Sequence, residues 1–375
     1  MVHIGSLKES SPAPSSDDQS RVLHDIVHNQ LLFFAQEYPQ WGLTPPNFSL
    51  EKLHGEASNR IYYRIRSGAK SLILMQLPAG AMSASEEITS LKQKPEELPF
   101  LNIQRYLKAC ELPVPEIYAP LESSRLIFLE DFGDETFEKK VLASSSTDRI
   151  AWYKKAIDLL IEFQEKTAEN PTRKTDSCLA FSRSFDATLL NWEFEHFFEY
   201  GIEARLGIQI APEDRAVMRE EAGRLTEAII RAPQVLVHRD FQSRNLMVFQ
   251  GVLKLLDFQD ALKGPLPYDL VALLRDSYIE LPSEEVSLLI GYYCGRKSLD
   301  QNTFFEMFDR MTIQRKLKDA GRFVYIDRVK KNPSFLPWIP ASLRYVEQAF
   351  QRQLDTQSEN KNFFERLRKY VPEWK

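Results

Sequence analysis

The chain has 375 residues, a net charge of −5 and a sequence pI of about 5.8. Hydrophobic residues make up 43% of it and charged residues 27%, an ordinary globular composition, and the length predicts two lobes or domains. The acidic balance argues against a nucleic-acid partner bound through basic patches, and the apolar runs are too short to span a bilayer.

The compartment is indicated by the cysteines and the N-terminus. Cys110, Cys178 and Cys294 are scattered without C-x-x-C spacing, which is typical of a reducing compartment and predicts no structural zinc. The N-terminus lacks a basic region followed by a long apolar core, so we expect no secretory signal. We therefore expect the protein to be cytoplasmic, not to associate with a membrane and not to need an obligate protein partner.

The N-terminal part of the chain is predicted to be rich in strands. Residues 1–20 are rich in Ser, Pro and charge and are predicted to form a disordered tail. The apolar spacing over 21–38 predicts an amphipathic helix. Three strands are then predicted over 48–53, 61–66 and 71–77. A short helix over 100–110 and a fourth strand over 125–129 follow.

The C-terminal part is predicted to be mainly helical. Helical periodicity occurs over 148–166, 187–206 and 213–230, and again from 268 onward. The fold class expected is therefore α+β. The expected boundaries are a nucleotide-binding N-lobe over 21–131 and a helical C-lobe over 132–375, which carries the catalytic loop and the acceptor site.

One segment of the C-lobe carries recognisable chemistry. His238, Asp240 and Asn245 follow the order H-x-D-x-x-x-x-N, and an apolar strand then leads to Asp257. This is the layout of a kinase catalytic loop and metal-binding strand. Asp240 fits the carboxylate that receives the acceptor hydroxyl's proton, while Asn245 and Asp257 fit the ligands of Mg²⁺. The alternative is a polar hairpin with a helix-capping Asp.

Nucleotide contacts are predicted at a turn and at the hinge between the lobes. Gly55, Ala57 and Ser58 lie between two predicted strands, where backbone N–H groups and a hydroxyl could meet phosphates. An ordinary hairpin turn is the alternative. The backbone from Glu130 to Phe132 is predicted to hold the adenine of ATP.

The strand over 71–77 lacks the lysine that meets the α and β phosphates in kinases. Met75 and Gln76 occupy that neighbourhood. Arg64 or Arg66 on the preceding strand could supply the charge instead. Otherwise the family dispenses with this lysine, or the site is impaired.

Acceptor contacts are predicted at four positions. Glu195 lies in the aromatic and acidic segment 190–198, which either lines an acceptor pocket or forms an aromatic core stripe. Asp260 follows the metal aspartate closely and either supports it or faces the substrate. Arg275 and Asp276 form either a surface ion pair or a substrate contact.

Three polar residues near the catalytic loop are given structural roles. His238 is predicted to pack and hydrogen-bond locally, because Asp240 already suits the base. Arg239 is predicted to be an ion-pair partner. Asp269 is predicted to be the N-cap of the helix that begins near residue 268.

Taken together, HRDFQSRN, LLDFQDA and GPLPYDLVALLRDSY resemble the aminoglycoside-phosphotransferase-like kinases. More narrowly, the chain is similar to the bacterial anomeric kinases of N-acetylmuramate and N-acetylglucosamine used in cell-wall recycling. The likeness runs from about residue 25 to 350 and includes LILMQLPAG, LIFLEDFGDETF and IQRKLKDAGRF. The resemblance extends to the strand over 71–77, because the family also lacks the lysine there.

The resemblance implies a bilobal protein-kinase-like fold, MgATP as donor and phosphorylation of an amino sugar at its C1 hydroxyl. Asp240 matches the catalytic aspartate of the family, and Asn245 and Asp257 match its metal ligands. The chain departs from the family at Asn59, where an aromatic residue is expected, and at Gln76, where Asp is usual.

Two other functions stay open. One is a kinase for an aminoglycoside or a choline-like amine, and the other is a pseudokinase that binds nucleotide as an interaction module. The missing lysine favours the module, whereas Asp240, Asn245 and Asp257 favour an enzyme. A protein kinase is disfavoured, because little room for an activation loop follows Asp257 and no A-P-E motif is present.

Overall fold

The computed structural model describes residues 16–45, 47–53, 60–78, 97–168, 178–356 and 360–375. The chain divides into two compact units, one of residues 1–81 and 116–131 and the other of residues 82–115 and 132–375. Within the described ranges, no helix combines the length and the apolar character needed to cross a membrane.

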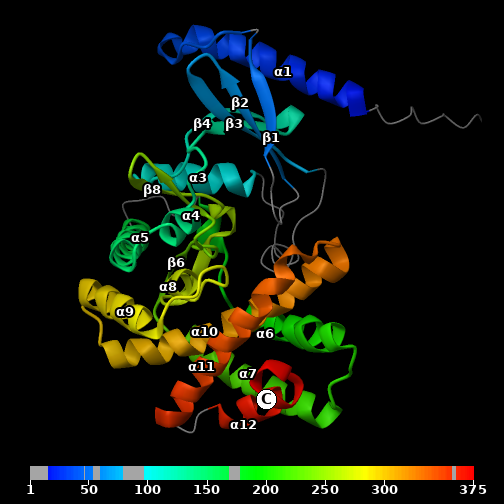
Figure 1. The fold of residues 1–375 in the computed structure, drawn as a ribbon, viewed down its shortest axis with the longest axis vertical. Coiled ribbons are helices and arrows are strands. Elements are labelled where there is room, and N and C mark those ends of the chain that lie inside the picture. Colours follow the sequence, from blue (N-terminus) through cyan, green and yellow to red (C-terminus); the bar gives the residue numbers. More distant parts are fainter. Residues whose placement is uncertain (1–15, 46, 54–59, 79–96, 169–177, 357–359) are drawn as a thin grey trace, which may run out of the picture. The chain divides into compact units, whose positions relative to one another are not determined.

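The first unit is a five-stranded antiparallel sheet with one long helix, α1 (Ser16–Glu37) (Figure 1). Val27, Leu31 and Phe34 of α1 pack on Leu74 and Phe128 of the sheet in a shared hydrophobic core. The strands follow the order β1-β2-β3-β5-β4, and their bounds are β1 (Ser49–Leu53), β2 (Ile61–Ser67), β3 (Lys70–Gln76), β4 (Ile117–Leu121) and β5 (Leu126–Glu130).

Two features of this unit differ from the prediction. Helix α1 begins at Ser16, so residues 16–20 are helical and not part of a disordered tail, while residues 1–15 lie outside the described ranges. Strand β4 was not predicted, because Pro120 lies within it. Proline is tolerated there because β4 is an edge strand of the sheet, paired only with β5.

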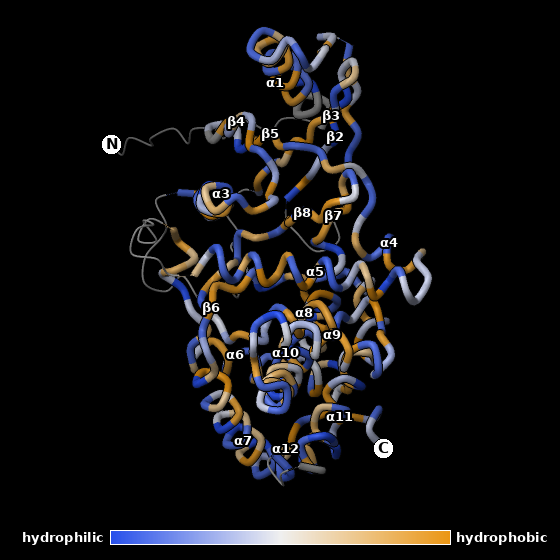
Figure 2. The backbone as a smooth tube through the Cα atoms, turned by 90° about the vertical axis from the view of Figure 1, so that its left-hand side faces the viewer, coloured by the Kyte–Doolittle hydropathy of each residue, from blue (hydrophilic) through white to orange (hydrophobic). Residues whose placement is uncertain are grey.

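The second unit is mainly helical, and α10 (Gln301–Lys330) contacts most of its other long helices. Along α5 (Ser146–Lys166), hydrophobic and hydrophilic stretches alternate, as expected of a helix with one buried face (Figure 2). The other helices are α3 (Pro99–Ala109), α4 (Phe137–Leu142), α6 (Ala187–His196), α7 (Pro212–Ile230), α8 (Tyr268–Leu274), α9 (Ser283–Lys297), α11 (Ile339–Thr356) and α12 (Lys361–Tyr370).

Two short antiparallel ribbons interrupt these helices. One pairs β6 (Gln234–Val237) with β9 (Leu262–Pro265), and the other pairs β7 (Leu246–Phe249) with β8 (Val252–Leu255). A 3-10 turn, η6 (Phe258–Asp260), connects β8 to β9. Residues 238–245, here called the 238–245 loop, therefore connect strands of two different ribbons.

Helix α3 and the segment after α6 also differ from the prediction. The predicted N-lobe 21–131 included α3, but the structure groups it with the second unit, where Phe100 stacks on Phe258 at 5.1 Å between ring centroids. The helix predicted over 187–206 is α6 followed by a π-helix, η5 (Phe197–Ala204). π-Helical turns are rare and occur often at functional sites.

The close crossing of α10 and η5 predicts that a side chain at Gly321 destabilises the fold. A Cβ on Gly321 of α10 would lie 2.9 Å from the Cα of Phe197, so the two helix backbones would have to separate. We expect Gly321→Ala to lower the free energy of unfolding by about 1–3 kcal/mol in urea denaturation. In contrast, Gly223→Ala in α7 meets no atom within 4 Å and should raise it by about 0.5–1 kcal/mol. Equal effects of both substitutions would contradict the close crossing.

Candidate active site

The 238–245 loop is a compact turn closed by its own backbone. The Gln242 N–H donates to the carbonyl of Asp240 at 2.8 Å, and the Asn245 N–H donates to the carbonyl of Gln242 at 3.0 Å. The side-chain Nδ2 of Asn245 also donates to the Asp240 carbonyl, at 3.0 Å. These bonds fix the position of Asn245 relative to Asp240.

Asp269 of α8 holds the beginning of the loop. Its carboxylate accepts the backbone N–H groups of His238 at 2.6 Å and of Arg239 at 3.0 Å, and Arg239 has a φ of 77°. Burial raises the pKa of Asp269 to about 7, while the two N–H donors and Arg315 act in the opposite direction. The predicted N-cap role is wrong, because Pro267 occupies the cap position and the carboxylate bonds to the loop instead.

Asp276 holds the middle of the loop in the same way. It is fully buried and accepts both the N–H of Ser243 at 2.9 Å and its hydroxyl at 2.6 Å. Burial raises the pKa of Asp276 as well, against these donors. Asp269 lies in the first turn of α8 and Asp276 follows the end of that helix at Leu274, so one short segment supplies both carboxylates to the loop.

Arg275 is likewise inside the protein. It is 3% exposed, donates to Gln348 Oε1 at 3.3 Å and lies over the ring of Tyr345 at 5.1 Å. The prediction of a surface ion pair between Arg275 and Asp276 is therefore wrong. Both side chains make internal contacts, Asp276 with Ser243 and Arg275 with Gln348. Their burial weakens the predicted contacts with an acceptor, which stay predictions.

Arg315 of α10 contacts both the backbone of the 238–245 loop and the side chain of Asp240. Its side chain is fully buried, donates to the Arg239 carbonyl at 2.8 Å and approaches Asp240 Oδ1 at 3.6 Å. The guanidinium also lies over the ring of Tyr268 at 4.7 Å. The Asp240 side chain remains 32% exposed, so its carboxylate is oriented from the protein side and still reaches solvent.

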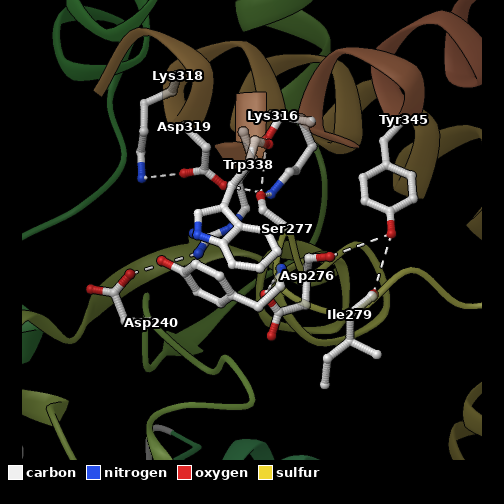
Figure 3. Close-up of polar contacts among 12 residues, drawn as sticks. Asp240, Asp276, Ser277, Ile279, Lys316, Lys318, Asp319, Trp338 and Tyr345 are labelled. Carbon is white, nitrogen blue, oxygen red and sulfur yellow. Dashed lines mark hydrogen bonds and ion pairs between the residues drawn. The ribbon is translucent and has the colours of Figure 1, made fainter. Parts of the chain in front are cut away.

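A buried chain of charges ties α10 to the segment after α8 (Figure 3). Asp319 pairs with Lys316 at 2.7 Å and with Lys318 at 3.1 Å, and Lys316 donates to the Ser277 hydroxyl at 2.6 Å. Although burial acts to raise it, the pKa of Asp319 is held well below its usual range by Lys316, Lys318 and Arg315. These α10 residues were not among the predicted site residues; the run of charges in QRKLKDAGR, at positions 315, 316, 318, 319 and 322, was the available signal.

Asn245 and Asp257 are brought together by the backbone. The Leu256 N–H, directly before Asp257, donates to the carbonyl of Asn245 at 2.9 Å. Gln259 Nε2 donates to Asp257 Oδ1 at 2.9 Å, and Asp257 has a φ of 61°. Amide and carboxylate oxygens are hard donors of the kind that Mg²⁺ prefers, so the pair fits that ion. In the described part of the chain no group of three or more His, Cys, Asp or Glu forms a metal cluster.

The predicted phosphate turn at Gly55, Ala57 and Ser58 lies outside the described residues. Arg64, in the first unit, is 4% exposed and forms a two-point ion pair with Asp131, at 2.7 and 3.1 Å. Its charge is therefore matched inside its own unit, which weakens the expectation that it replaces the strand lysine.

Glu130 and Phe132 lie on either side of the boundary between the two units. The Glu130 N–H donates to the Glu116 carbonyl at 3.0 Å, and its carboxylate accepts the Glu116 N–H at 3.2 Å. Phe132 is buried in the second unit against Phe249, at 5.5 Å between ring centroids. Both remain predicted adenine contacts through their backbones.

Glu195 and Asp260 have different surroundings. Glu195 accepts two bonds from Arg219, at 2.6 and 3.0 Å, and one from Arg215 at 3.1 Å, so its charge is matched by α7. Although partial burial acts to raise it, the pKa of Glu195 is lowered by these arginines. Asp260 is half-buried and interacts electrostatically with Arg239, which also approaches the carboxylate of Glu193 at 3.7 Å. Arg239 is therefore an ion-pair partner, as predicted.

Comparison with known proteins decides the family. The family model described as the phosphotransferase enzyme family, APH, matches residues 49–302. The chain belongs to this phosphotransferase family. The resemblance inferred from HRDFQSRN and LLDFQDA is thereby confirmed.

Relatives of this phosphotransferase include two bacterial proteins named N-acetylmuramate/N-acetylglucosamine kinase. The protein from Pseudomonas putida is 28% identical over 88% of this chain and 93% of its own length. The protein from Neisseria meningitidis is 30% identical over 82% of this chain and 87% of its own length. Among solved structures, choline kinase from Cryptosporidium parvum has a TM-score of 0.57 at 12% identity, covering 88% of this chain and 97% of that one. That likeness confirms the kinase-like fold.

The hydrogen bonds that Asp269 accepts predict how a substitution at this position affects stability and turnover of the phosphotransferase. Asp269→Asn replaces one acceptor oxygen by an NH₂ group that faces a backbone N–H. We expect the free energy of unfolding to fall by about 1–3 kcal/mol and kcat to fall roughly tenfold or more, because the loop loses its anchor. Urea denaturation and steady-state kinetics measure the two effects. Asp300→Asn, at the exposed N-cap of α10, is the matched control and should change neither; a wild-type kcat in Asp269→Asn would contradict the anchoring role.

His238 predicts a pH dependence of stability. Its ring is fully buried between those of Phe163 and Phe241, and burial lowers its pKa to about 4. The unfolded chain takes up this proton near pH 6.5, so the associated stability is complete above pH 6.5 and is lost as the pH falls toward 4. From pH 7.5 to pH 5, wild type should lose about 2 kcal/mol more than His238→Phe in urea denaturation. Identical pH dependence of the two proteins would show that His238 does not titrate in this way.

Proposed function

We propose that the protein is an ATP- and Mg²⁺-dependent cytoplasmic kinase that phosphorylates the anomeric hydroxyl of an amino sugar, N-acetylmuramate or N-acetylglucosamine, to give a sugar 1-phosphate. The observation that carries the proposal is the match to relatives with these substrates in their names over more than four fifths of the chain. The geometry of the 238–245 loop supports it, because an accessible carboxylate lies beside a pair of hard oxygen ligands.

In the proposed mechanism, Asp240 orients the sugar hydroxyl and accepts its proton as the bond from the sugar oxygen to the γ-phosphorus forms. The bond from that phosphorus to the oxygen bridging it to the β-phosphate breaks, and ADP leaves. Arg315, 3.6 Å away, holds the carboxylate in one orientation. An anomeric hydroxyl is more acidic than an ordinary alcohol, so Asp240 need not be a strong base. Asn245 and Asp257 would hold Mg²⁺, which when bound neutralises charge on the phosphates. The proposal assigns ATP to the N-terminal lobe and its hinge, and the sugar to the helical C-lobe.

Two alternatives are weaker. A polycationic aminoglycoside or a choline-like amine would want unpaired carboxylates, but Glu195 is matched by Arg215 and Arg219. Likeness to choline kinases extends to the fold alone. A pseudokinase does not need an accessible carboxylate that a buried arginine orients. This chain has such a carboxylate in Asp240, beside Arg315.

The test is an acceptor panel with the purified protein and MgATP. The acceptors are N-acetylmuramate, N-acetylglucosamine, other sugars, kanamycin and choline, with products identified by mass and phosphorus NMR. We expect a sugar 1-phosphate, and Asp240→Asn should lower its kcat at least roughly a hundredfold while ATP still binds. Asp300→Asn serves as the matched control. Product on kanamycin or choline alone, or undiminished turnover in Asp240→Asn, would refute the proposal.

A further inference from the structure

A patch of aromatic rings forms where α10 meets α6 and η5. His196 is flanked by Trp192 at 5.2 Å, Tyr200 at 4.7 Å and Tyr325 at 5.3 Å between ring centroids. His196 is buried, whereas the other three rings are partly exposed. Burial lowers the pKa of His196 to about 4, so the ring is neutral near pH 7. Partly exposed aromatic rings offer apolar faces on which a sugar ring can stack.

Arg322 lies on α10 between Arg315, which bonds the 238–245 loop, and Tyr325 of the aromatic patch. It follows Arg315 by seven residues, so the two arginines lie on the same face of the helix about two turns apart. Its guanidinium lies 4.9 Å from the centre of the Tyr325 ring. Arg315, two turns before it, approaches Asp240 Oδ1 at 3.6 Å, and the charges of Asp240 and Asp260 act on the Arg322 guanidinium.

The charge of Arg322 has no dedicated counter-ion in the part of the chain that the structure describes. Among the described residues it forms no ion pair, while its neighbour Lys318 pairs with Asp319 at 3.1 Å. Burial lowers the pKa of Arg322, as expected of a cation that is partly desolvated and not fully compensated. Such a guanidinium is a ready receptor for a carboxylate, which it binds through two charge-assisted hydrogen bonds.

The two acceptors of the proposed function differ in one substituent of the sugar ring, and that substituent decides whether the acceptor carries a negative charge. N-acetylmuramate carries a lactyl ether with a carboxylate, whereas N-acetylglucosamine has a hydroxyl at that position and is neutral. We infer that Arg322 is a specificity-determining residue that binds the lactyl carboxylate of the acceptor while the aromatic patch contacts the sugar ring. The inference rests on the proposed function and deepens it, because it makes the carboxylated sugar the preferred acceptor.

The test compares wild type, Arg322→Gln and Arg322→Lys on three acceptors: N-acetylmuramate, its neutral methyl ester and N-acetylglucosamine. We expect Arg322→Gln to lower kcat/KM for N-acetylmuramate roughly ten- to hundredfold, mainly through KM. For the two neutral acceptors the change should be below about threefold, since no charge-assisted bond is lost. Arg322→Lys should recover part of the loss. Arg328→Gln, on the exposed end of the same helix, is the matched control.

The outcomes separate this inference from the proposed function. Equal losses on all three acceptors, or a raised KM for ATP, would overturn the role of Arg322 in acceptor choice and assign it to the phosphates or to folding. Wild-type turnover of N-acetylglucosamine without any preference for N-acetylmuramate over its methyl ester would overturn the inference and leave the sugar kinase intact. Absence of turnover on any of the sugars would refute the proposed function, and the inference with it.

Discussion

The arrangement of the site depends on two buried carboxylates that hold the backbone of the 238–245 loop. Asp269 accepts the N–H groups of His238 and Arg239, and Asp276 accepts the N–H and hydroxyl of Ser243. A buried carboxylate is costly unless donors surround it, and backbone donors are costly to bury without acceptors. Each group therefore requires the other, so the backbone of the loop is held in one conformation.

Helix α10 adds a second constraint from the other side. Arg315 bonds the Arg239 carbonyl and approaches Asp240, while Lys316 and Asp319 link the helix to Ser277, directly after Asp276. The same interactions serve folding and orientation of the Asp240 carboxylate. Such a network is sensitive to loss of one member, because the remaining charge would be buried without its partner.

Much of the fold and of the chemistry could be predicted from the sequence. Strands β1, β2, β3 and β5 and the long helices followed from periodicity, because one face of each element packs in a core. Strand β4 and the π-helix did not, since an edge position tolerates Pro120 and a π-helix has no simple periodicity. Motif spacing singled out Asp240, Asn245 and Asp257, because a short loop and strand place them within one local segment.

What the sequence by itself determined is which residue types lie in the 238–245 loop and at Asp257, and which family the chain belongs to. Only the tertiary structure decided what polar residues elsewhere contact. Asp276 and Arg275 proved to be buried, Glu195 is matched by α7, and Arg315 reaches the loop from 76 residues away. The physical reason is that a carboxylate or guanidinium acquires its role from burial and from partners distant in sequence, and no local pattern records either one.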